Sequence, residues 1–422
     1  MGRRPEAGQP MRRRAVVALL LVVLLVGGAA LAAFIVWKQR HPGSIRGSAS
    51  EEFSSTEAPG GTQRSENAVR KVPWPTYGYD DARTRYAAPF KLRPPFRRVW
   101  DVQAGSLLEF PPVVAYGRLY VGTNLGRFLA LDAKTGKTDW QKSFRRCIAA
   151  SAVVARRVVY EVLMDPAPCA PHSENAPGYV VAMDAETGEE LWRFRSGVVE
   201  SSPLVVGGTL YFGSWDHKVY ALDAKTGDVR WSFTTGDKVK AGPAFAKGLV
   251  VIGSYDDKVY ALDARRGKLR WSTSGYANFY ATPSIAYGRV FIGSPDRRVY
   301  AFGLKSGKLL WAHTTGGYVY GAAAVWNKTV FVGSYDHRFY GLDAATGDVR
   351  WSFRANGQIS GAPTVLDGVV YFATVNRRTY GLDVRTGKKL WTFPDGKYTP
   401  VVADEERIYL AGYRKLFGLE PQ

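Results

Sequence analysis

One spacing constrains this chain more than any other feature: eight of its 12 tryptophans recur at a nearly constant interval. Most of the intervals are 39 or 40 residues, and the exception, from Trp140 to Trp192, is 52. A fixed period of this length indicates one supersecondary unit repeated along the chain, with each unit burying its faces against its neighbours. The eight positions are Trp100, Trp140, Trp192, Trp231, Trp271, Trp311, Trp351 and Trp391.

The residues before each tryptophan repeat as well. Examples are LDAKTGDVRW (222–231), GLKSGKLLW (303–311) and LDVRTGKKLW (382–391). In the Asp-x-x-x-Gly turn, the aspartate accepts backbone N–H groups and the glycine takes the positive φ that closes the turn. Four short apolar runs separated by turn residues, as in 240–275, predict a four-stranded antiparallel unit.

These units predict an all-β fold, an eight-bladed β-propeller of four-stranded antiparallel blades over residues 73–422. Each tryptophan lies on the outermost strand and offers apolar area that seals one blade against the next. After Trp391 the chain supplies only three more strands, whereas an additional strand around Trp100 precedes the first blade. We therefore expect the strand around Trp100 to complete the eighth blade and close the ring.

The repeated element VYALDAKTGDVRW (219–231) and the leader WPTYG (74–78) resemble the pyrroloquinoline-quinone (PQQ)-like propeller repeat, and the resemblance covers residues 73–422. Two branches of that superfamily matter. Quinoprotein dehydrogenases hold PQQ and a calcium ion over the channel and oxidise alcohols or sugars. Non-catalytic members include the propeller lipoprotein of the outer-membrane β-barrel assembly machinery. The resemblance is specific for the fold and weakly specific for the function.

The N-terminus predicts a membrane anchor. Residues 15–37 carry no charge and, as a helix, are about 34 Å long, enough to cross a bilayer core of roughly 30 Å. The arginine-rich tail of residues 1–14 favours a cytoplasmic N-terminus, and so an extracytoplasmic propeller on a single-pass plasma-membrane protein. The alternative is a signal peptide cleaved near residues 30–32. Residues 38–72, rich in serine, glycine and charge, predict a flexible linker.

The second blade departs from the period because residues 164–178 insert 12 extra residues between its second and third strands. Cys169 lies in the insertion and Cys147 just before the first strand of the same blade. Both sites should open on the same face of the propeller. In an oxidising compartment they would form a disulfide, and the alternative is two unpaired thiols.

The mouth of the central channel is where a propeller most often binds a ligand. Glu109 and Glu200 are the only acids predicted there, too few for the six to eight oxygens that calcium takes, and the chain lacks the adjacent cysteine pair of quinoprotein dehydrogenases. We therefore predict no catalytic, cofactor or metal residue, with PQQ and calcium as the alternative. Aligned repeats place at the mouth Glu109, Ile148, Glu200, Lys240, Tyr280, Tyr320, Ser360 and Lys397.

The same face carries a candidate basic ring, because the residue that opens the third strand is basic in seven blades. The chain as a whole has 57 basic and 37 acidic residues, a net charge of +20, which favours anionic partners. We expect a monomeric, non-catalytic scaffold in the cell envelope that binds an acidic protein surface or anionic envelope polymer, and no nucleic acid. The alternatives are a quinoprotein dehydrogenase or a small-ligand sensor. The ring comprises Arg127, Lys218, Lys258, Arg298, Arg338, Arg378 and Lys415.

Overall fold

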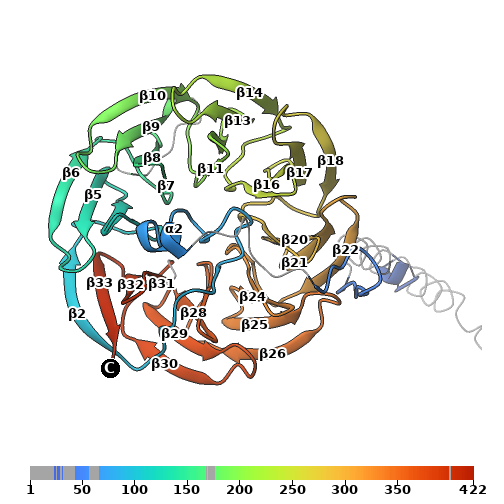
Figure 1. The fold of residues 1–422 in the computed structure, drawn as a ribbon. Coiled ribbons are helices and arrows are strands. Elements are labelled where there is room, and N and C mark those ends of the chain that lie inside the picture. Colours follow the sequence, from blue (N-terminus) through green and yellow to red (C-terminus); the bar gives the residue numbers. More distant parts are fainter. Residues whose placement is uncertain are drawn as a thin grey trace, which may run out of the picture. The chain divides into compact units, whose positions relative to one another are not determined.

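The protein is described by a computed structural model over residues 43–56, 66–167, 169, 176–398 and 401–422, with a few positions between 23 and 31. The strands form eight sheets arranged around a central axis (Figure 1). Seven sheets have four strands, and one has a fifth, β1 (Tyr86–Ala87), which runs parallel to its neighbour. The predicted eight-bladed propeller of four-stranded antiparallel blades is confirmed.

Each blade is a meander whose first strand faces the channel and whose last strand faces outward, and a short helix, α2 (Glu66–Lys71), precedes the first blade. Blade 1 comprises β3 (Val113–Ala115), β4 (Arg118–Gly122), β5 (Arg127–Asp132) and β6 (Thr138–Ser143), and blade 2 comprises β7 (Val153–Ala155), β8 (Val158–Leu163), β9 (Gly178–Asp184) and β10 (Glu190–Ser196). Blade 3 comprises β11 (Leu204–Val206), β12 (Thr209–Ser214), β13 (Lys218–Asp223) and β14 (Val229–Thr234), and blade 4 comprises β15 (Ala244–Ala246), β16 (Leu249–Gly253), β17 (Lys258–Asp263) and β18 (Leu269–Ser274). Blade 5 comprises β19 (Ser284–Ala286), β20 (Arg289–Ser294), β21 (Arg298–Gly303) and β22 (Leu309–Thr314), and blade 6 comprises β23 (Ala324–Trp326), β24 (Thr329–Gly333), β25 (Arg338–Asp343) and β26 (Val349–Arg354). Blade 7 comprises β27 (Thr364–Leu366), β28 (Val369–Thr374), β29 (Arg378–Asp383) and β30 (Lys389–Phe393), and blade 8 comprises β31 (Val401–Ala403), β32 (Ile408–Ala411), β33 (Lys415–Pro421) and β2 (Phe96–Gln103).

The eighth blade joins the two ends of the propeller sequence. Strand β2, from before the first blade, pairs antiparallel with the last strand of the chain, β33, and Trp100 lies opposite Gly418. The outermost strand of the blade is therefore the N-terminal one, as predicted. Unfolding this blade would require the separation of segments more than 300 residues apart in sequence.

The tryptophan and the glycine of the repeat are two halves of one contact between blades. The Trp231 indole donates its N–H to the Ala264 carbonyl of the next blade at 2.9 Å. The same indole packs on Gly267, where φ is +67° and an added Cβ would lie 2.6 Å from the ring. Only glycine satisfies both conditions at this position. The aspartate of the turn accepts backbone N–H groups, as Asp223 does from Lys225 at 2.8 Å.

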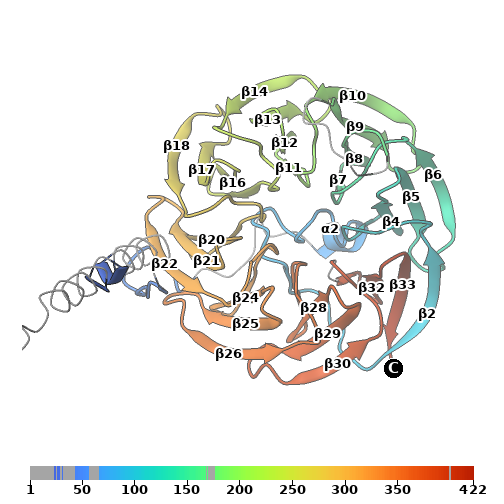
Figure 2. The same ribbon diagram turned by 180° about the vertical axis from the view of Figure 1, so that it is seen from behind.

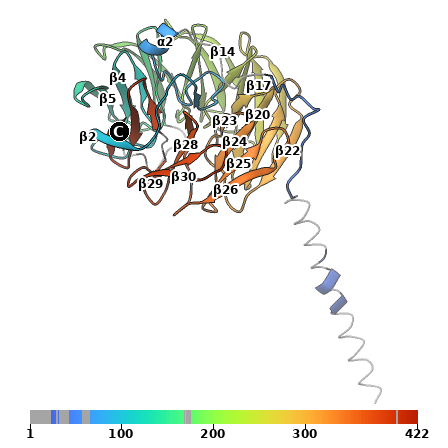
Figure 3. The same cartoon turned by 60° about the horizontal axis from the view of Figure 1, so that its bottom comes forward.

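Part of the predicted flexible linker is packed on the propeller. Residues 45–54, here called the strap, run along β22 in two views (Figures 1 and 3). Ile45 and Ala312 exchange backbone hydrogen bonds of 2.7 and 2.9 Å. The buried Arg289 guanidinium donates to the carbonyls of Ser48 and Glu51, both at 2.6 Å. The propeller unit accordingly begins at Ile45.

The strap supplies a group that blade 5 lacks. The six other blades that have this turn carry an aspartate at its start, but blade 5 has Gly303. The carboxylate of Glu52 occupies the position where a side chain of residue 303 would be, 2.5 Å from an added Cβ, and accepts the Lys305 N–H at 3.2 Å. Glu52 thus replaces the missing turn aspartate from outside the repeat. Repeat periodicity alone cannot reveal such a contact.

We predict that Gly303→Asp releases the strap, because the new side chain would clash with the Glu52 carboxylate and repel its charge. Tryptic cleavage after Arg46, followed by mass spectrometry under native conditions, should become about tenfold faster as local opening becomes easier. Combining Gly303→Asp with Glu52→Gly should return the rate toward that of the Glu52→Gly variant alone. An unchanged cleavage rate in Gly303→Asp would contradict the proposed fit between the strap and blade 5.

The predicted membrane anchor falls largely outside the described residues, as does the basic tail of residues 1–14. In the part of the chain that the structure describes, no helix combines the length and apolar character that a membrane crossing requires.

Candidate binding site at the channel mouth

The central channel is filled from one end by the chain itself. Residues 73–87, here called the plug, lie along the channel in views from both sides (Figures 1 and 2). The plug contacts the innermost strands of most blades through backbone hydrogen bonds, and Trp74 at its start exchanges two of them with Val114 of β3. Carbonyls of Pro75, Asp81, Ala82, Thr84 and Arg85 accept N–H groups of Val154, Phe245, Ile285, Val325 and Val365, respectively.

Arg83 fixes the plug to blades 3 and 4. Its guanidinium is fully buried and donates to the backbone carbonyls of Pro243, Pro203 and Ser202 at 2.9, 3.0 and 3.2 Å. It also donates to the Thr76 hydroxyl at 2.6 Å and to the Tyr77 carbonyl within the plug. Burial, with the neighbouring Arg85, lowers the pKa of Arg83 to about 9, which leaves it protonated at neutral pH.

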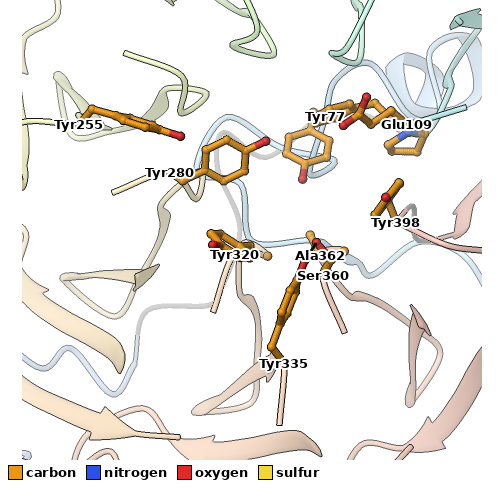
Figure 4. Close-up of a pocket in the computed structure, with 13 residues that line it drawn as sticks. Tyr77, Glu109, Tyr255, Tyr280, Tyr320, Tyr335, Ser360, Ala362 and Tyr398 are labelled. Atoms are coloured by element: carbon orange, nitrogen blue, oxygen red, sulfur yellow. Dashed lines mark hydrogen bonds between the residues drawn. The ribbon is translucent and has the colours of Figure 1, made fainter. Parts of the chain in front are cut away.

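Above the plug, the opposite end of the channel forms a pocket of about 300 Å³. Tyr77 of the plug contributes to its lining, and tyrosines of neighbouring blades surround it (Figure 4). Among the described residues of the lining, Glu109 alone is charged. The lining residues are Tyr77, Glu109, Phe110, Pro111, Tyr255, Tyr280, Tyr320, Gly321, Tyr335, Ser360, Gly361, Ala362 and Tyr398.

The structure separates the predicted mouth ring into two groups. Glu109, Tyr280, Tyr320 and Ser360 line the pocket together. The remaining four ring residues are not part of that lining, and of these Ile148 is buried, with 2% of its surface exposed. The other three are Glu200, Lys240 and Lys397.

Glu200 and Lys240 form a partly buried ion pair beside the pocket. Lys240 Nζ lies 3.2 Å from Glu200 Oε2, and the side chains are 17% and 10% exposed. Tyr280 donates its hydroxyl proton to Glu200 Oε1 at 3.1 Å. The Glu200 carboxylate, followed by burial and then Glu109, raises the pKa of Tyr280 well above its ordinary value. Tyr280 is therefore a neutral hydrogen-bond donor at physiological pH.

Sequence reasoning missed several pocket tyrosines. Tyr255 and Tyr335 lie in the turns between second and third strands, not at the starts of innermost strands. A signal was present, since the residue before the repeated turn aspartate is aromatic in three blades, as Trp215, Tyr255 and Tyr335. The Tyr255 N–H donates to the Lys238 carbonyl, and the Tyr335 N–H donates to the Tyr318 carbonyl. Lys238 and Tyr318 belong to the connections between blades, so these turns lie on the same face as the mouth.

The predicted disulfide is present between Cys147 and Cys169, with the Cα atoms 5.1 Å apart. It belongs to a small apolar cluster that contains the buried Trp215 and the pocket residue Phe110. The ring of Trp215 lies 4.2 Å from the Lys240 ammonium. The disulfide therefore supports the wall of the mouth on the side of blades 1 to 3.

The seven residues of the candidate basic ring open the third strands of their blades. Arg298, however, is 2% exposed and lies 3.2 Å from Asp296, so it does not belong to an exposed ring. Lys415 is paired with Asp101 at 2.9 Å. Arg338 and Arg378 are exposed. The positive charge on this face is thus interrupted at blade 5.

A family model described as outer membrane protein assembly factor BamB (PQQ_2) matches residues 173–238, 216–319 and 295–422. These matches together cover more than half of the chain. The chain belongs to the BamB (PQQ_2) family. The crystal structure of BamB from Moraxella catarrhalis has a TM-score of 0.65 and 15% identity, and the match covers 77% of this chain and all of that one. At this identity, the likeness shows the fold alone.

This BamB-family chain is also similar to quinoprotein dehydrogenases. A 1-butanol dehydrogenase (cytochrome c) of Thauera butanivorans is 28% identical over 152 residues, which are 32% of this chain and 20% of that protein. The chain thus spans about a fifth of that curated relative, and a similar share of the quinohemoprotein alcohol dehydrogenase of Comamonas testosteroni, of which 21% is covered. The crystal structure of the latter has a TM-score of 0.70 and 15% identity, over 84% of this chain and 81% of that one.

The mouth of this BamB-family propeller does not provide the donor set for PQQ and calcium. PQQ carries three carboxylates, yet the pocket lining contains one acid and neither lysine nor arginine. The nearby Lys240 is already paired with Glu200. Among the described residues, no group of three histidine, cysteine, aspartate or glutamate side chains is arranged to hold a metal ion.

Proposed function

We propose that this protein is a non-catalytic binding platform of the cell envelope, with the face around the channel mouth as its docking surface. One observation carries the proposal: the plug fills the channel from the far side and leaves a pocket walled by tyrosines. Tyrosine offers a large, rigid contact area with a polar tip, a combination enriched in protein interfaces.

The envelope location and the membrane tether remain part of the proposal. An apolar, uncharged run at residues 15–37 after an arginine-rich tail supports a single-pass anchor with the propeller outside the cytoplasm. The Cys147–Cys169 disulfide supports an oxidising compartment. The family description, outer membrane protein assembly factor, supports a role in the envelope. The exposed basic residues around the mouth suit an acidic protein or an anionic envelope polymer.

A quinoprotein dehydrogenase is the second candidate. The names of the sequence relatives favour it. The composition of the mouth disfavours it, because the carboxylates of PQQ would lie near the carboxylate of Glu109. The described residues of the pocket lining include no lysine or arginine to bind them.

Calorimetric titration of the full-length protein in detergent separates the two candidates. We expect no heat of binding when PQQ is added at up to 100 μM with calcium, because the mouth offers no site for either. The intact dehydrogenase of Comamonas testosteroni, stripped of PQQ, would serve as the positive control. Calcium-dependent binding at micromolar or tighter Kd would overturn the platform proposal.

A further inference from the structure

We propose that the pocket at the channel mouth binds a cationic side chain, a lysine or arginine, that a protein partner inserts along the channel axis. This inference rests on the proposed function, because it requires a partner to dock on the mouth face. It adds the chemistry that the partner must present at the centre of that surface.

Tyrosines of the pocket wall pack edge to face against one another. Tyr320 is in edge-to-face contact with Tyr335, with ring centroids 5.1 Å apart and planes at 76°. It makes a second such contact with Tyr280, at 5.8 Å and 83°. Rings held at right angles form a concave corner, and the face of each ring carries the negative part of its quadrupole. A cation within about 6 Å of such faces is attracted to them.

The charge of the pocket favours a cation as well. Glu109 contributes a carboxylate to the described part of its lining. The described residues of the lining include neither lysine nor arginine. The pocket interior thus combines a carboxylate with tyrosine hydroxyls, which can accept the N–H groups of an ammonium or guanidinium.

The same mouth already contains cations bound in this way. Lys240 Nζ lies 4.2 Å from the Trp215 ring and 5.2 Å from Tyr255, beside the Glu200 carboxylate. This is a lysine seated between aromatic rings and an acid, supplied by the chain itself. Arg85 likewise lies over the Tyr77 ring at 3.9 Å. Within the described part of the chain, cation contacts of this kind are made by neighbouring rings but not by Tyr320 or Tyr335.

The size of the pocket suits one inserted side chain. Its volume of about 300 Å³ lies at the lower end of the range for small-molecule sites, roughly 300–1,000 Å³. The plug prevents passage beyond this depth, because Arg83 and the backbone bonds of residues 75–85 fill the channel below. A side chain on a docked surface reaches such a blind pocket, while the partner's backbone stays on the rim.

The test uses the full-length protein in detergent and three capped tripeptides, acetyl-Gly-Lys-Gly-amide, its arginine analogue and its glutamine analogue. Ligand-observed saturation-transfer NMR should give Kd values of about 1–10 mM for the two cationic peptides, as a single side chain supports. The glutamine peptide should bind at least about fivefold more weakly, because it lacks the charge.

Variants locate the binding. Glu109→Gln and Tyr320→Leu should each weaken binding of the lysine peptide at least about fivefold. Tyr320→Phe, which keeps the ring, should weaken binding less. Tyr276→Leu is the matched control, since Tyr276 is 50% exposed on the same face and does not line the pocket. Thermal melting shows whether each variant is folded. If Tyr320→Leu does not fold, Glu109→Gln still tests the inference.

Equal binding of the lysine and glutamine peptides would overturn the inference, as would unchanged affinity in Glu109→Gln or absence of binding at 50 mM peptide. Preferential binding of a neutral hexose added at the same concentration would overturn it too. Each of these results leaves the docking proposal intact, because that proposal fails only through binding of PQQ or through absence of a partner at the mouth face.

Discussion

Arg83→Met should lower the free energy of unfolding of the propeller by about 3–9 kcal/mol, because three buried carbonyls lose their donor at roughly 1–3 kcal/mol each. Arg83 connects the plug to the carbonyls of Ser202, Pro203 and Pro243 in blades 3 and 4. Methionine keeps the length of the side chain but cannot donate. Urea unfolding followed by tryptophan fluorescence measures the change.

The control for this experiment is Arg157→Met. Arg157 pairs with Glu186 at 3.4 Å, but the two side chains are 71% and 66% exposed. An exposed pair of this kind contributes at most about 1 kcal/mol. We expect the Arg83 variant to be clearly less stable than the Arg157 variant. Equal stability would mean that the plug contributes little to the fold.

Loss of the disulfide should lower the free energy of unfolding by about 3 kcal/mol. Cys147 and Cys169 close a loop with a sequence separation of 22, and the cost follows from the greater freedom of the unfolded chain without it. The Cys147→Ser/Cys169→Ser variant should therefore unfold at a lower urea concentration than the oxidised protein. Wild-type protein unfolded in the presence of dithiothreitol should show a similar shift.

Dithiothreitol added to the double variant is the matched control, because it has no disulfide to reduce and its midpoint should stay constant. If reductant leaves the wild-type midpoint unchanged as well, the disulfide does not stabilise the fold. The fluorescence of Trp215 gives a second measurement, since Trp215 packs in the same apolar cluster as the disulfide and contacts the Lys240 ammonium. The fluorescence of the folded double variant should differ from that of wild type at this tryptophan.

The sequence predicted the propeller because the fold is built from a local pattern repeated many times. The contact of Trp231 with Gly267 recurs from blade to blade, so one reading of the motif applies to the others. Closure by the strand around Trp100 followed from counting strands. By contrast, the strap and the plug each occur once. The contact of Glu52 with Lys305 spans 253 residues and leaves no periodic trace.

The candidate site was predicted in part. The alignment of innermost strands named Glu109, Tyr280 and Tyr320, and these three residues line one pocket. It could not place Tyr77, because the plug belongs to no blade. Nor could it show that Arg298 is buried, since that depends on the packing of Arg298 against Asp296 and the ring of Tyr276, 4.8 Å away. Position in a repeat predicts the backbone, whereas exposure depends on the neighbours of each side chain.

Photo-crosslinking in native membranes tests whether the mouth face is the docking surface. A photo-reactive residue replaces Tyr318, 46% exposed and beside Tyr320, or, as the control, the exposed Lys225 in the turn between β13 and β14 on the opposite face. We expect a discrete protein adduct from position 318 that position 225 does not give. An adduct from position 225 with none from position 318 would contradict it.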